Sequence, residues 1–332
     1  MQNIEVSLLA GETRRAVIDI GSNSIKLLIA DIDQVGVVVP LIEKSCQTRL
    51  AEGTDASGKF SQNALRESLR VLREYIDLCI RKGVEKPLIF ATSAARGVSA
   101  EEFSLLSLPI FDEYGLKIQI ITSDQEALWA FKGVCTDAAF TNKILFLTDV
   151  GGGSAQFTIG KDGKYVWSRS YPLGAVRLLE KYPFSDPPTL EEKNDLILQI
   201  SESITHLRQE IESDISIKNL LPNFDLRNLQ WIGTGGAATI LSSLNLGLVD
   251  FDRNKLENSV VTAEELQKWG DKLWGVSLEE RKNFPGLPSC RADIMLPGVA
   301  IYLAIMQVFS FSSIRISARG GRYGALSDER FF

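Results

Sequence analysis

Two short segments of the chain combine a carboxylate with a tight turn of glycine and small polar residues. The first is Asp19-Ile20-Gly21-Ser22-Asn23-Ser24, and the second is Asp149-Val150-Gly151-Gly152-Gly153-Ser154. Glycine turns present backbone N–H groups that bind anions such as phosphate. A phosphate beside a carboxylate needs a cation between the two groups, and Mg²⁺ prefers such oxygen ligands. Both segments therefore fit phosphate-binding turns that act together with Mg²⁺.

The repetition of this pattern favours phosphate binding over a simpler explanation. Alone, the second segment is equally well a glycine-rich hairpin in which Asp149 is a turn residue, because short glycine motifs are weak predictors. Asp149, however, follows Asp19 by 130 residues, which is about one domain length. Each carboxylate ends an apolar run, and another apolar run follows each turn. We therefore expect strand–turn–strand units in two similar halves that face one ligand.

Two polar stretches near the first turn have open interpretations. Thr92 and Arg96 follow an apolar run at residues 87–91, and α/β folds place ligand contacts at such strand ends. Arg96 either holds a phosphate oxygen or forms a surface ion pair. The segment at residues 48–58 is polar and interrupted by glycine, and it is either a surface connection or a contact with the substrate.

Glu126 and a third glycine turn complete the candidate residues. Glu126 lies in the first turn of an expected helix, where the helix dipole favours a carboxylate, and its functional role would be that of a general base between the two halves. Gly235 and Gly236 lead from an expected strand at residues 230–232 into a helix. They either contact a phosphate or nucleoside, or they allow close packing of strand and helix.

The length and charge of the chain limit its class. With 332 residues, it is long enough for two domains, each with its own core. No apolar run approaches the roughly 20 residues that span a bilayer, and the N-terminal segment lacks the features of a signal peptide. We therefore expect a cytoplasmic protein without membrane contact. The net charge of −6 argues against a broad nucleic-acid surface.

The histidine and cysteine content argues against several kinds of catalysis. His206, the single histidine, lies in a polar helical stretch and is expected at the surface. Serine–histidine mechanisms and histidine-ligated metals are therefore disfavoured, which leaves carboxylates and a metal as the expected chemistry. Cys46, Cys79, Cys135 and Cys290 lack C-x-x-C spacing, so we expect small buried hydrophobic residues without disulfides.

The hydrophobic patterns predict similar elements twice: three strands joined by short turns, followed by alternating helices and strands. Strands are predicted at residues 15–19, 25–31, 36–42, 87–91, 118–121, 144–149, 154–159, 164–172, 230–232 and 313–318. Helices are predicted at residues 61–82, 126–131, 189–213, 262–274, 278–282 and 296–308, and a short helix follows residue 324. Ser61 is the expected N-cap of the first helix.

Duplicated halves with an Asp-x-Gly turn in each are similar to the superfamily of actin, sugar kinases and heat-shock ATPases. Within it, residues 14–328 resemble the exopolyphosphatase and guanosine pentaphosphate phosphohydrolase (Ppx/GppA) family. Besides the two turns, the resemblance is carried by Arg49-Leu50-Ala51-Glu52-Gly53, Ala91-Thr92-Ser93-Ala94-Ala95-Arg96, Glu126-Ala127, Gly133-Val134, Gly233-Thr234-Gly235-Gly236-Ala237 and Arg291-Ala292-Asp293-Ile294-Met295-Leu296-Pro297-Gly298.

The resemblance implies a fold and an activity. The fold is α/β, with two ribonuclease-H-like (actin-like ATPase) domains and a cleft between them. The first domain would occupy residues 1–132 and the second residues 133–317, with a helix at about residues 318–332 packing back on the first. The implied reaction removes the terminal phosphate from inorganic polyphosphate or guanosine pentaphosphate by attack of water, with Mg²⁺ as the cofactor.

The resemblance also implies residue roles. Glu126 falls on the family's catalytic glutamate, which orients or deprotonates the attacking water. Asp149 would be the second catalytic residue and, with Asp19, would hold the metal. The residues implied in binding substrate phosphate are Asp19, Gly21, Ser22, Asn23, Ser24, Thr92, Arg96, Gly151, Gly152, Gly153, Ser154, Gly235 and Gly236.

The chain departs from the family pattern at two places. The family usually has glutamate where Gln156 stands, and glutamine carries no negative charge and cannot act as a base. The family often has two adjacent acids around Glu126, whereas Gln125 occupies the first position here, and a slip of two residues would move the catalytic position to Asp124.

The chain stops near residue 332, which implies a short two-domain form with less surface for a long polyphosphate chain.

Three functions stay open at this point. The first is a Mg²⁺-dependent hydrolase acting on polyphosphate or a guanosine polyphosphate. The second is a weakly active or inactive protein that senses one of these ligands, which Gln156 favours. The third is an ATP-dependent kinase, which the third glycine turn favours and the lack of a separate sugar-site signature disfavours. No nucleic-acid partner is expected, and a homodimer is left open.

Overall fold

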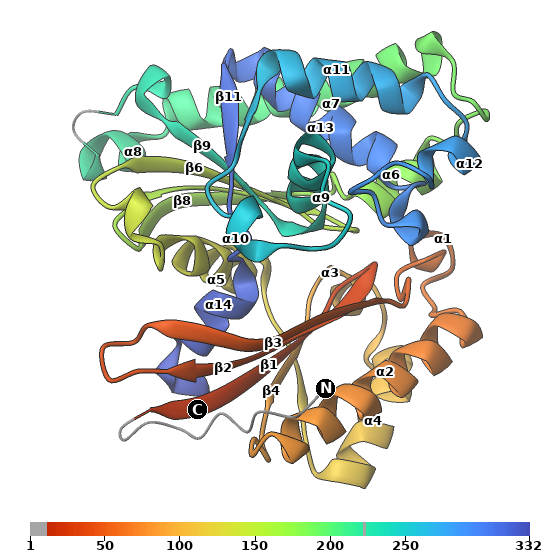
Figure 1. Ribbon diagram of the computed structural model, residues 1–332, viewed down its shortest axis with the longest axis vertical. Coiled ribbons are helices and arrows are strands. Elements are labelled where there is room, and N and C mark those ends of the chain that lie inside the picture. Colours follow the sequence, from red (N-terminus) through yellow and green to blue (C-terminus); the bar gives the residue numbers. More distant parts are fainter. Residues whose placement is uncertain (1–11, 222–223) are drawn as a thin grey trace. The chain divides into compact units, whose positions relative to one another are not determined.

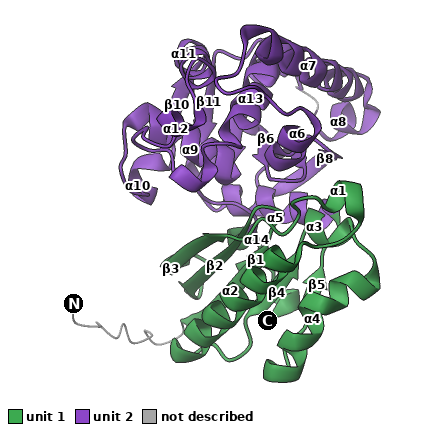
Figure 2. Ribbon diagram, turned by 90° about the vertical axis from the view of Figure 1, so that its right-hand side faces the viewer, with its two compact units in different colours: residues 1–122, 322–332 green, residues 123–321 purple. Residues whose placement is uncertain are grey.

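The computed structural model describes residues 12–221 and 224–332. The chain divides into two compact units, which are coloured separately in Figure 2. Unit 1 contains the residues up to Thr122 together with Arg322–Phe332, and unit 2 contains Ser123–Gly321. The sequence placed the boundary between residues 132 and 133, whereas the compact units divide between residues 122 and 123. The helix that carries Glu126 therefore lies wholly in unit 2.

Unit 1 is built on a five-stranded sheet in the order β3-β2-β1-β4-β5 (Figure 1). Its strands are β1 (Thr13–Ile20), β2 (Ser24–Ile32), β3 (Val38–Gln47), β4 (Leu88–Ala91) and β5 (Ile118–Ile120). The first three form the antiparallel meander that the sequence predicted, and β4 and β5 run parallel to β1. The carboxyl ends of β1, β4 and β5 therefore meet at one edge of the sheet, where α/β folds place ligands.

The helices of unit 1 cover this sheet and complete its core. They are α1 (Thr54–Ser57), α2 (Gln62–Arg81), α3 (Ser93–Arg96), α4 (Ala100–Tyr114) and, from Arg322 onward, α14 (Gly321–Leu326). Ser61 caps α2 as predicted, because its side chain accepts a hydrogen bond from the backbone N–H of Ala64 (3.2 Å). Arg322 Nη1 donates to the carbonyl of Leu27 (2.7 Å), which joins residues 322–332 to the sheet.

Unit 2 repeats the plan with a six-stranded sheet in the order β10-β11-β9-β6-β7-β8. Its strands are β6 (Ile144–Val150), β7 (Ala155–Lys161), β8 (Lys164–Tyr171), β9 (Gln230–Thr234), β10 (Val260–Thr262) and β11 (Ser313–Ile316). The meander of β6, β7 and β8 matches the first three strands of unit 1, and β9 runs parallel to β6. The duplication expected from the sequence is thus present in the strands.

The helices of unit 2 enclose the larger core. They are α5 (Ser123–Cys135), α6 (Ala175–Lys181), α7 (Leu190–Ser213), α8 (Ile215–Leu220), α9 (Gly235–Leu246), α10 (Arg253–Leu256), α11 (Ala263–Trp274), α12 (Leu278–Arg281) and α13 (Met295–Phe309). The apolar helix α13 is buried along nearly its whole length and packs against α7 and α11. Pro297 lies in its first turn, where proline removes no helical hydrogen bond.

Some local predictions were wrong. No strand was expected at β10, which is a three-residue edge strand paired only with β11. Among the cysteines, only Cys79 is buried, Cys46 and Cys135 are partly buried, and Cys290 is exposed, so the expectation of four buried cysteines was confirmed for Cys79 alone and was wrong for Cys290. The four cysteines, all of them described residues, form no disulfide with one another. His206 is on the surface as predicted, with 66% of its side chain exposed. Within the described residues, no helix has the length and hydrophobicity to cross a membrane.

Candidate active site

The two carboxylate–glycine segments form the same four-residue turn. In unit 1, the backbone N–H of Gly21 donates to the carbonyl of Ser24 (3.1 Å), where β1 turns into β2. In unit 2, the N–H of Gly151 donates to the carbonyl of Ser154 (2.9 Å), where β6 turns into β7. A Cβ atom on Gly21 would lie 3.1 Å from the Ser24 carbonyl oxygen, and one on Gly151 would lie 3.2 Å from that of Ser154. Glycine therefore opens both turns because a larger residue would crowd the closing carbonyl.

Hydrogen bonds from the segment after β3 fix the direction of the first turn. The carbonyl of Ser22 accepts the N–H of Ala51 (3.0 Å), and the carbonyl of Asn23 accepts the N–H groups of Thr48 (3.1 Å) and Arg49 (3.0 Å). The C=O and N–H of a trans peptide unit point in opposite directions. The N–H groups of Asn23 and Ser24 therefore point away from the segment after β3, as in a backbone nest for an anion.

The start of α6 fixes the second turn in the same way. The carbonyl of Gly151 accepts the N–H of Ala175 (3.0 Å), and that of Gly152 accepts the N–H of Val176 (2.9 Å). By the same peptide geometry, the N–H groups of Gly152 and Gly153 point away from α6. Each unit thus presents one turn whose carbonyls are already hydrogen-bonded and whose amides are directed outward.

Further predicted residues surround the first turn at the same edge of the sheet. The N–H of Thr92 donates to the carbonyl of Ile20 (3.1 Å), which places Thr92 directly beside the turn. Arg96 Nη1 donates to the carbonyl of Ile121 (2.9 Å), so part of its guanidinium is hydrogen-bonded to the residue that follows β5. Asp19 lies opposite Lys26 in the β1–β2 register. Burial raises the pKa of Asp19, and the positive charges of Lys26 and Arg322 partly offset that rise.

The segment after β3 also borders a polar cavity in unit 1. The cavity has a volume of about 310 Å³ and is lined by side chains that include Gln47, Thr48, Arg49, Glu52, Ser61 and Asn63. Gln47 Nε2 donates to Asn23 Oδ1 (3.0 Å), which connects the cavity wall to the first turn. The segment that the sequence left as a surface connection or a substrate contact is therefore built into the support of the candidate site.

In unit 2, the third glycine turn lies beside Asp149. The β6–β9 register places Asp149 opposite Thr234, the residue before Gly235. Gly235 has a φ of 85°, and a Cβ atom added to it would overlap the Asp149 carboxylate. A Cβ atom on Gly236 would overlap the guanidinium of Arg291, so both glycines allow charged side chains to approach the backbone. Burial lowers the pKa of Arg291, which is a partly buried residue.

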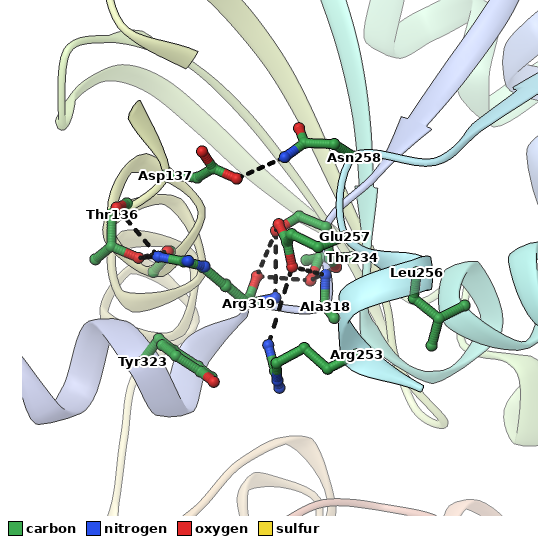
Figure 3. Close-up of polar contacts among 12 residues, drawn as sticks. Thr136, Asp137, Thr234, Arg253, Leu256, Glu257, Asn258, Ala318, Arg319 and Tyr323 are labelled. Atoms are coloured by element: carbon green, nitrogen blue, oxygen red, sulfur yellow. Dashed lines mark hydrogen bonds and ion pairs between the residues drawn. The ribbon is translucent and has the colours of Figure 1, made fainter. Parts of the chain in front are cut away.

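A polar network holds β11 against the start of α9 (Figure 3). Thr234 is the N-cap residue of α9, but its hydroxyl donates to the carbonyls of Ser317 (3.0 Å) and Arg319 (3.0 Å) and caps no amide of the helix. Glu257 accepts hydrogen bonds from the Ser317 hydroxyl (2.8 Å) and the Ala318 N–H (2.9 Å). The first amides of α9 are thus left without a side-chain cap, next to Asp149.

Glu126 faces the sheet that carries Asp149. Ala130 and Phe131 of α5 belong to the same buried cluster as Leu147 of β6. Glu126 precedes Ala130 by four residues, and residues at this spacing share one face of a helix. Because side chains two apart on a strand share a face, Asp149 points to the same side of the sheet as Leu147. Glu126 and Asp149 therefore lie on one face of unit 2.

The competing position, Asp124, has a different environment. Asp124 is exposed in the first turn of α5, whereas Glu126 is only partly exposed. Of the two acids, Glu126 is thus the one placed toward the sheet and its glycine turn. This arrangement favours the alignment of Glu126, rather than Asp124, with the family's catalytic glutamate.

Each of the two turns lies beside a carboxylate, an oxygen ligand of the kind that Mg²⁺ prefers. Across residues 12–221 and 224–332, no three His, Cys, Asp or Glu side chains gather into a metal site. Mg²⁺ is usually held by one or two carboxylates together with water and substrate phosphates. Asp149 beside the second turn and Asp19 beside the first supply carboxylates of this kind.

Comparison with known proteins identifies the family. The sequence model of the Ppx/GppA phosphatase family matches residues 28–330. The chain belongs to this family. It is 29% identical over 295 residues to exopolyphosphatase 2 of Mycobacterium tuberculosis, which covers 87% of this chain and 88% of the relative. It is also 26% identical over 313 residues to a putative exopolyphosphatase of Haemophilus influenzae, covering 94% and 90%.

Solved structures of Ppx/GppA proteins share the fold. The crystal structure of the Aquifex aeolicus family member superimposes with a TM-score of 0.77 at 28% identity, covering 96% of this chain and 98% of that one. An exopolyphosphatase from Cytophaga hutchinsonii gives a TM-score of 0.82 at 23% identity, covering 95% and 96%. The two-domain actin-like fold expected from the sequence is therefore confirmed.

Three supporting residues of this Ppx/GppA chain had no role assigned from the sequence. Arg291 was noted only as part of a motif, and it lies against Gly236. A Cβ atom on Gly174 would overlap the backbone of Gly152 and Gly153, so glycine is needed where α6 meets the second turn. Tyr302 is fully buried in α13, and its pKa is raised well above the ordinary value by burial and by the nearby charge of Asp149. Each contact joins residues far apart in the sequence, so no local pattern signals it.

Proposed function

We propose that the chain hydrolyses the terminal phosphoanhydride bond of inorganic polyphosphate, of guanosine pentaphosphate, or of both, and releases phosphate. The observation that carries this proposal is the pair of matched turns, Gly21–Ser24 and Gly151–Ser154, each closed by the same glycine-to-serine hydrogen bond. Each turn follows a strand-end carboxylate and directs its amides away from the segment that anchors it. Two copies of one anion cradle suit a substrate made of linked phosphates.

In this proposal, residues of the chain bind the substrate phosphates and orient or activate the attacking water. The amides of both turns, with Thr92 and Arg96, bind phosphate oxygens. Glu126 orients the attacking water or removes its proton, and it lies on the same face of unit 2 as Asp149. Mg²⁺, held by Asp149 and Asp19, would neutralise phosphate charge when bound. Catalysis then comes from positioning and electrostatic stabilisation, with no covalent enzyme intermediate.

Two observations bear on the choice of substrate and on the alternatives. The exopolyphosphatase names of the relatives favour inorganic polyphosphate as the first substrate to test. Gln156, which lacks the negative charge usual in the family, favours a second candidate: a weakly active or inactive member that senses polyphosphate or guanosine polyphosphates. An ATP-dependent kinase, the third candidate, is favoured only by the glycine turn at Gly235.

A release assay separates these functions. The purified chain is incubated with Mg²⁺ and, separately, with long-chain polyphosphate, guanosine pentaphosphate or ATP, and free phosphate is measured over time. We expect release from polyphosphate or the pentaphosphate, little release from ATP, and loss of release when EDTA removes Mg²⁺. If no substrate releases phosphate while a guanosine polyphosphate or polyphosphate binds tightly in calorimetry, the sensor function replaces the hydrolase.

A further inference from the structure

Gln156 occupies a buried position directly opposite Asp149. The β6–β7 register pairs the two residues, and only 2% of Gln156 is exposed. Side chains that face each other across an antiparallel pair lie on the same side of the sheet. Gln156 therefore shares the α5-covered face with Asp149. The ring of Phe131 lies against Gly160 near the other end of β7, and Cys135, the last residue of α5, lies beside Gly163 just beyond that end. The start of α5, with Glu126, therefore lies toward the Gln156 end of the strand.

The amide of Gln156 is hydrogen-bonded to the second turn. Its Nε2 donates to the hydroxyl oxygen of Ser154 (2.8 Å) and, over a longer distance, to that of Ser170 (3.4 Å). An amide nitrogen has protons to give and no lone pair to accept with. The Ser154 oxygen is therefore an acceptor toward Gln156, which leaves the single hydroxyl proton of Ser154 for another acceptor.

A carboxylate at this position would reverse the polarity of that contact. Ser154 would then donate its only proton to residue 156 and would have none left for a phosphate oxygen. A second buried negative charge would also face Asp149, which like-charge repulsion disfavours unless a cation is bound. Glutamine therefore supplies no negative charge near the proposed metal ligand Asp149, but it leaves the Ser154 hydroxyl able to donate its proton.

We propose that Gln156 is a positioning residue that holds the Ser154 hydroxyl as a hydrogen-bond donor to a substrate phosphate. The proposal rests on the proposed function, because it takes the turn at Gly151–Ser154 to bind phosphate. It assigns to the neutral residue a role in substrate binding, separate from water activation by Glu126. It also makes the departure from the family pattern an adaptation of the site rather than a simple loss.

The decisive variant is Gln156→Glu, which keeps the shape and the acceptors of the side chain and removes its N–H donors. Gln156→Met removes the donors without adding a charge, and Ser154→Ala removes the hydroxyl itself. Ser170→Ala is the matched control, since the Ser170 contact is the longer one. Circular dichroism and thermal melts establish that each variant is folded before binding and turnover are compared.

We expect Ser154→Ala and Gln156→Glu each to raise the KM for polyphosphate, and the Kd for inorganic tripolyphosphate, by about tenfold or more, because each removes a hydrogen bond to a charged group. Gln156→Met should weaken binding by less, because the serine keeps its proton but loses its orientation. Ser170→Ala should stay within about twofold. The double variant Ser154→Ala/Gln156→Glu should bind tripolyphosphate no more weakly than the weaker-binding single variant, because both changes remove the same hydrogen bond.

Two results would overturn the inference. One is a Gln156→Glu variant that binds tripolyphosphate as tightly as the parent, and the other is full additivity in the double variant. Calorimetry with tripolyphosphate needs no turnover, so it tests the contact even if the parent releases no phosphate. Failure of the hydrolase function would appear instead as tight binding without release in the parent chain.

Discussion

The Oδ1 atom of Asp149 lies so close to the backbone of Gly235 that a Cβ atom at residue 235 would overlap it. The sequence offered two explanations for the third glycine turn, a ligand contact or close packing of strand and helix. The structure favours close packing with a specific partner, because the packed group is the candidate metal-binding carboxylate. Gly235 also has a φ of 85°, a conformation that other residues adopt at a cost.

Replacing Gly235 by alanine should damage activity far more than stability. The added methyl group would push the Asp149 carboxylate aside, and a shift of about 1 Å at a catalytic group can cost roughly 10²-fold in rate. We therefore expect kcat/KM to fall by about 10²-fold in a phosphate-release assay. Gly247→Ala is the matched control, because Gly247 has a similar φ of 62° with no atom within 4 Å of the added Cβ. Both variants should lose about 1–2 kcal/mol of stability, and equal activity in the two would contradict the role given to Gly235.

Glu126→Gln should remove turnover and leave binding largely intact. If Glu126 orients or deprotonates the attacking water, loss of its charge should lower kcat by about 10²- to 10⁴-fold, with little change in KM. Asp124→Asn, two residues earlier in the same helical turn, should change kcat by less than about twofold. Steady-state kinetics with polyphosphate and Mg²⁺ measure both constants. A larger loss in Asp124→Asn than in Glu126→Gln would move the base to Asp124.

Glu257 predicts a pH dependence of stability that is separate from catalysis. Its side chain is only 12% exposed. Burial raises its pKa, although hydrogen bonds from Ser317 and Ala318 and the charges of Arg319 and Arg253 act in the other direction. A carboxyl group with a raised folded-state pKa binds its proton more tightly in the folded than in the unfolded chain. Its contribution to stability is therefore present below the unfolded-state pKa and is lost as the pH rises through the folded-state pKa.

Glu257→Gln should remove this loss of stability at higher pH. The difference in Tm, variant minus parent, should become more positive between pH 4.5 and pH 8, because only the parent has a carboxyl group to ionise at this position. Thermal melts across this range, followed by circular dichroism, measure the difference. A difference that falls steadily with pH would show that the ionised carboxylate stabilises the fold, contrary to the direction of the pKa shift.

Tyr302→Phe should stabilise the protein. The Tyr302 hydroxyl is fully buried and has no hydrogen-bond partner among residues 12–221 and 224–332. A buried unpaired polar group costs free energy, so its removal should gain about 1 kcal/mol, or roughly 2–4 °C in Tm. Differential scanning calorimetry is the appropriate measurement. A drop in Tm would mean that the hydroxyl has a stabilising partner, of which the nearby Asp149 carboxylate is the first to test by a double-mutant cycle.

The sequence predicted the parts of the fold that depend on neighbouring residues. The Asp19–Ser24 and Asp149–Ser154 turns were recognisable because each is a local pattern of strand, carboxylate and glycine. Ser61 was recognisable as a helix cap because its partner is the N–H of Ala64, three residues away. The repeated meander of three strands followed from the alternation of apolar runs and turns. Local physical chemistry therefore predicted the repeated strand units and the two candidate phosphate turns, and the family resemblance supplied the two-domain fold.

The remaining features depend on contacts that the sequence order does not reveal. Arg291 meets Gly236, and Gly174 meets Gly152, only after the chain has folded. The strand β10 has three residues, too few to show an alternating pattern. The division between residues 122 and 123 falls where β5 runs into α5, without any change in composition. The role of Gln156 also required the structure, because an amide group can donate or accept, and the direction follows from its nitrogen facing the Ser154 hydroxyl.

Residues 322–332 complete unit 1, and this connectivity has a consequence for synthesis on the ribosome. Arg322 bonds to Leu27, and Arg15 Nη1 donates to the carbonyl of Leu326 (2.9 Å), so unit 1 closes through segments from both sides of unit 2. As the chain emerges, unit 2 is the continuous unit and can fold as soon as Gly321 has left the exit tunnel. Unit 1 begins to emerge first yet must wait for residues 322–332. The nascent β1–β2 hairpin therefore stays without its final partner until synthesis has passed through the whole of unit 2.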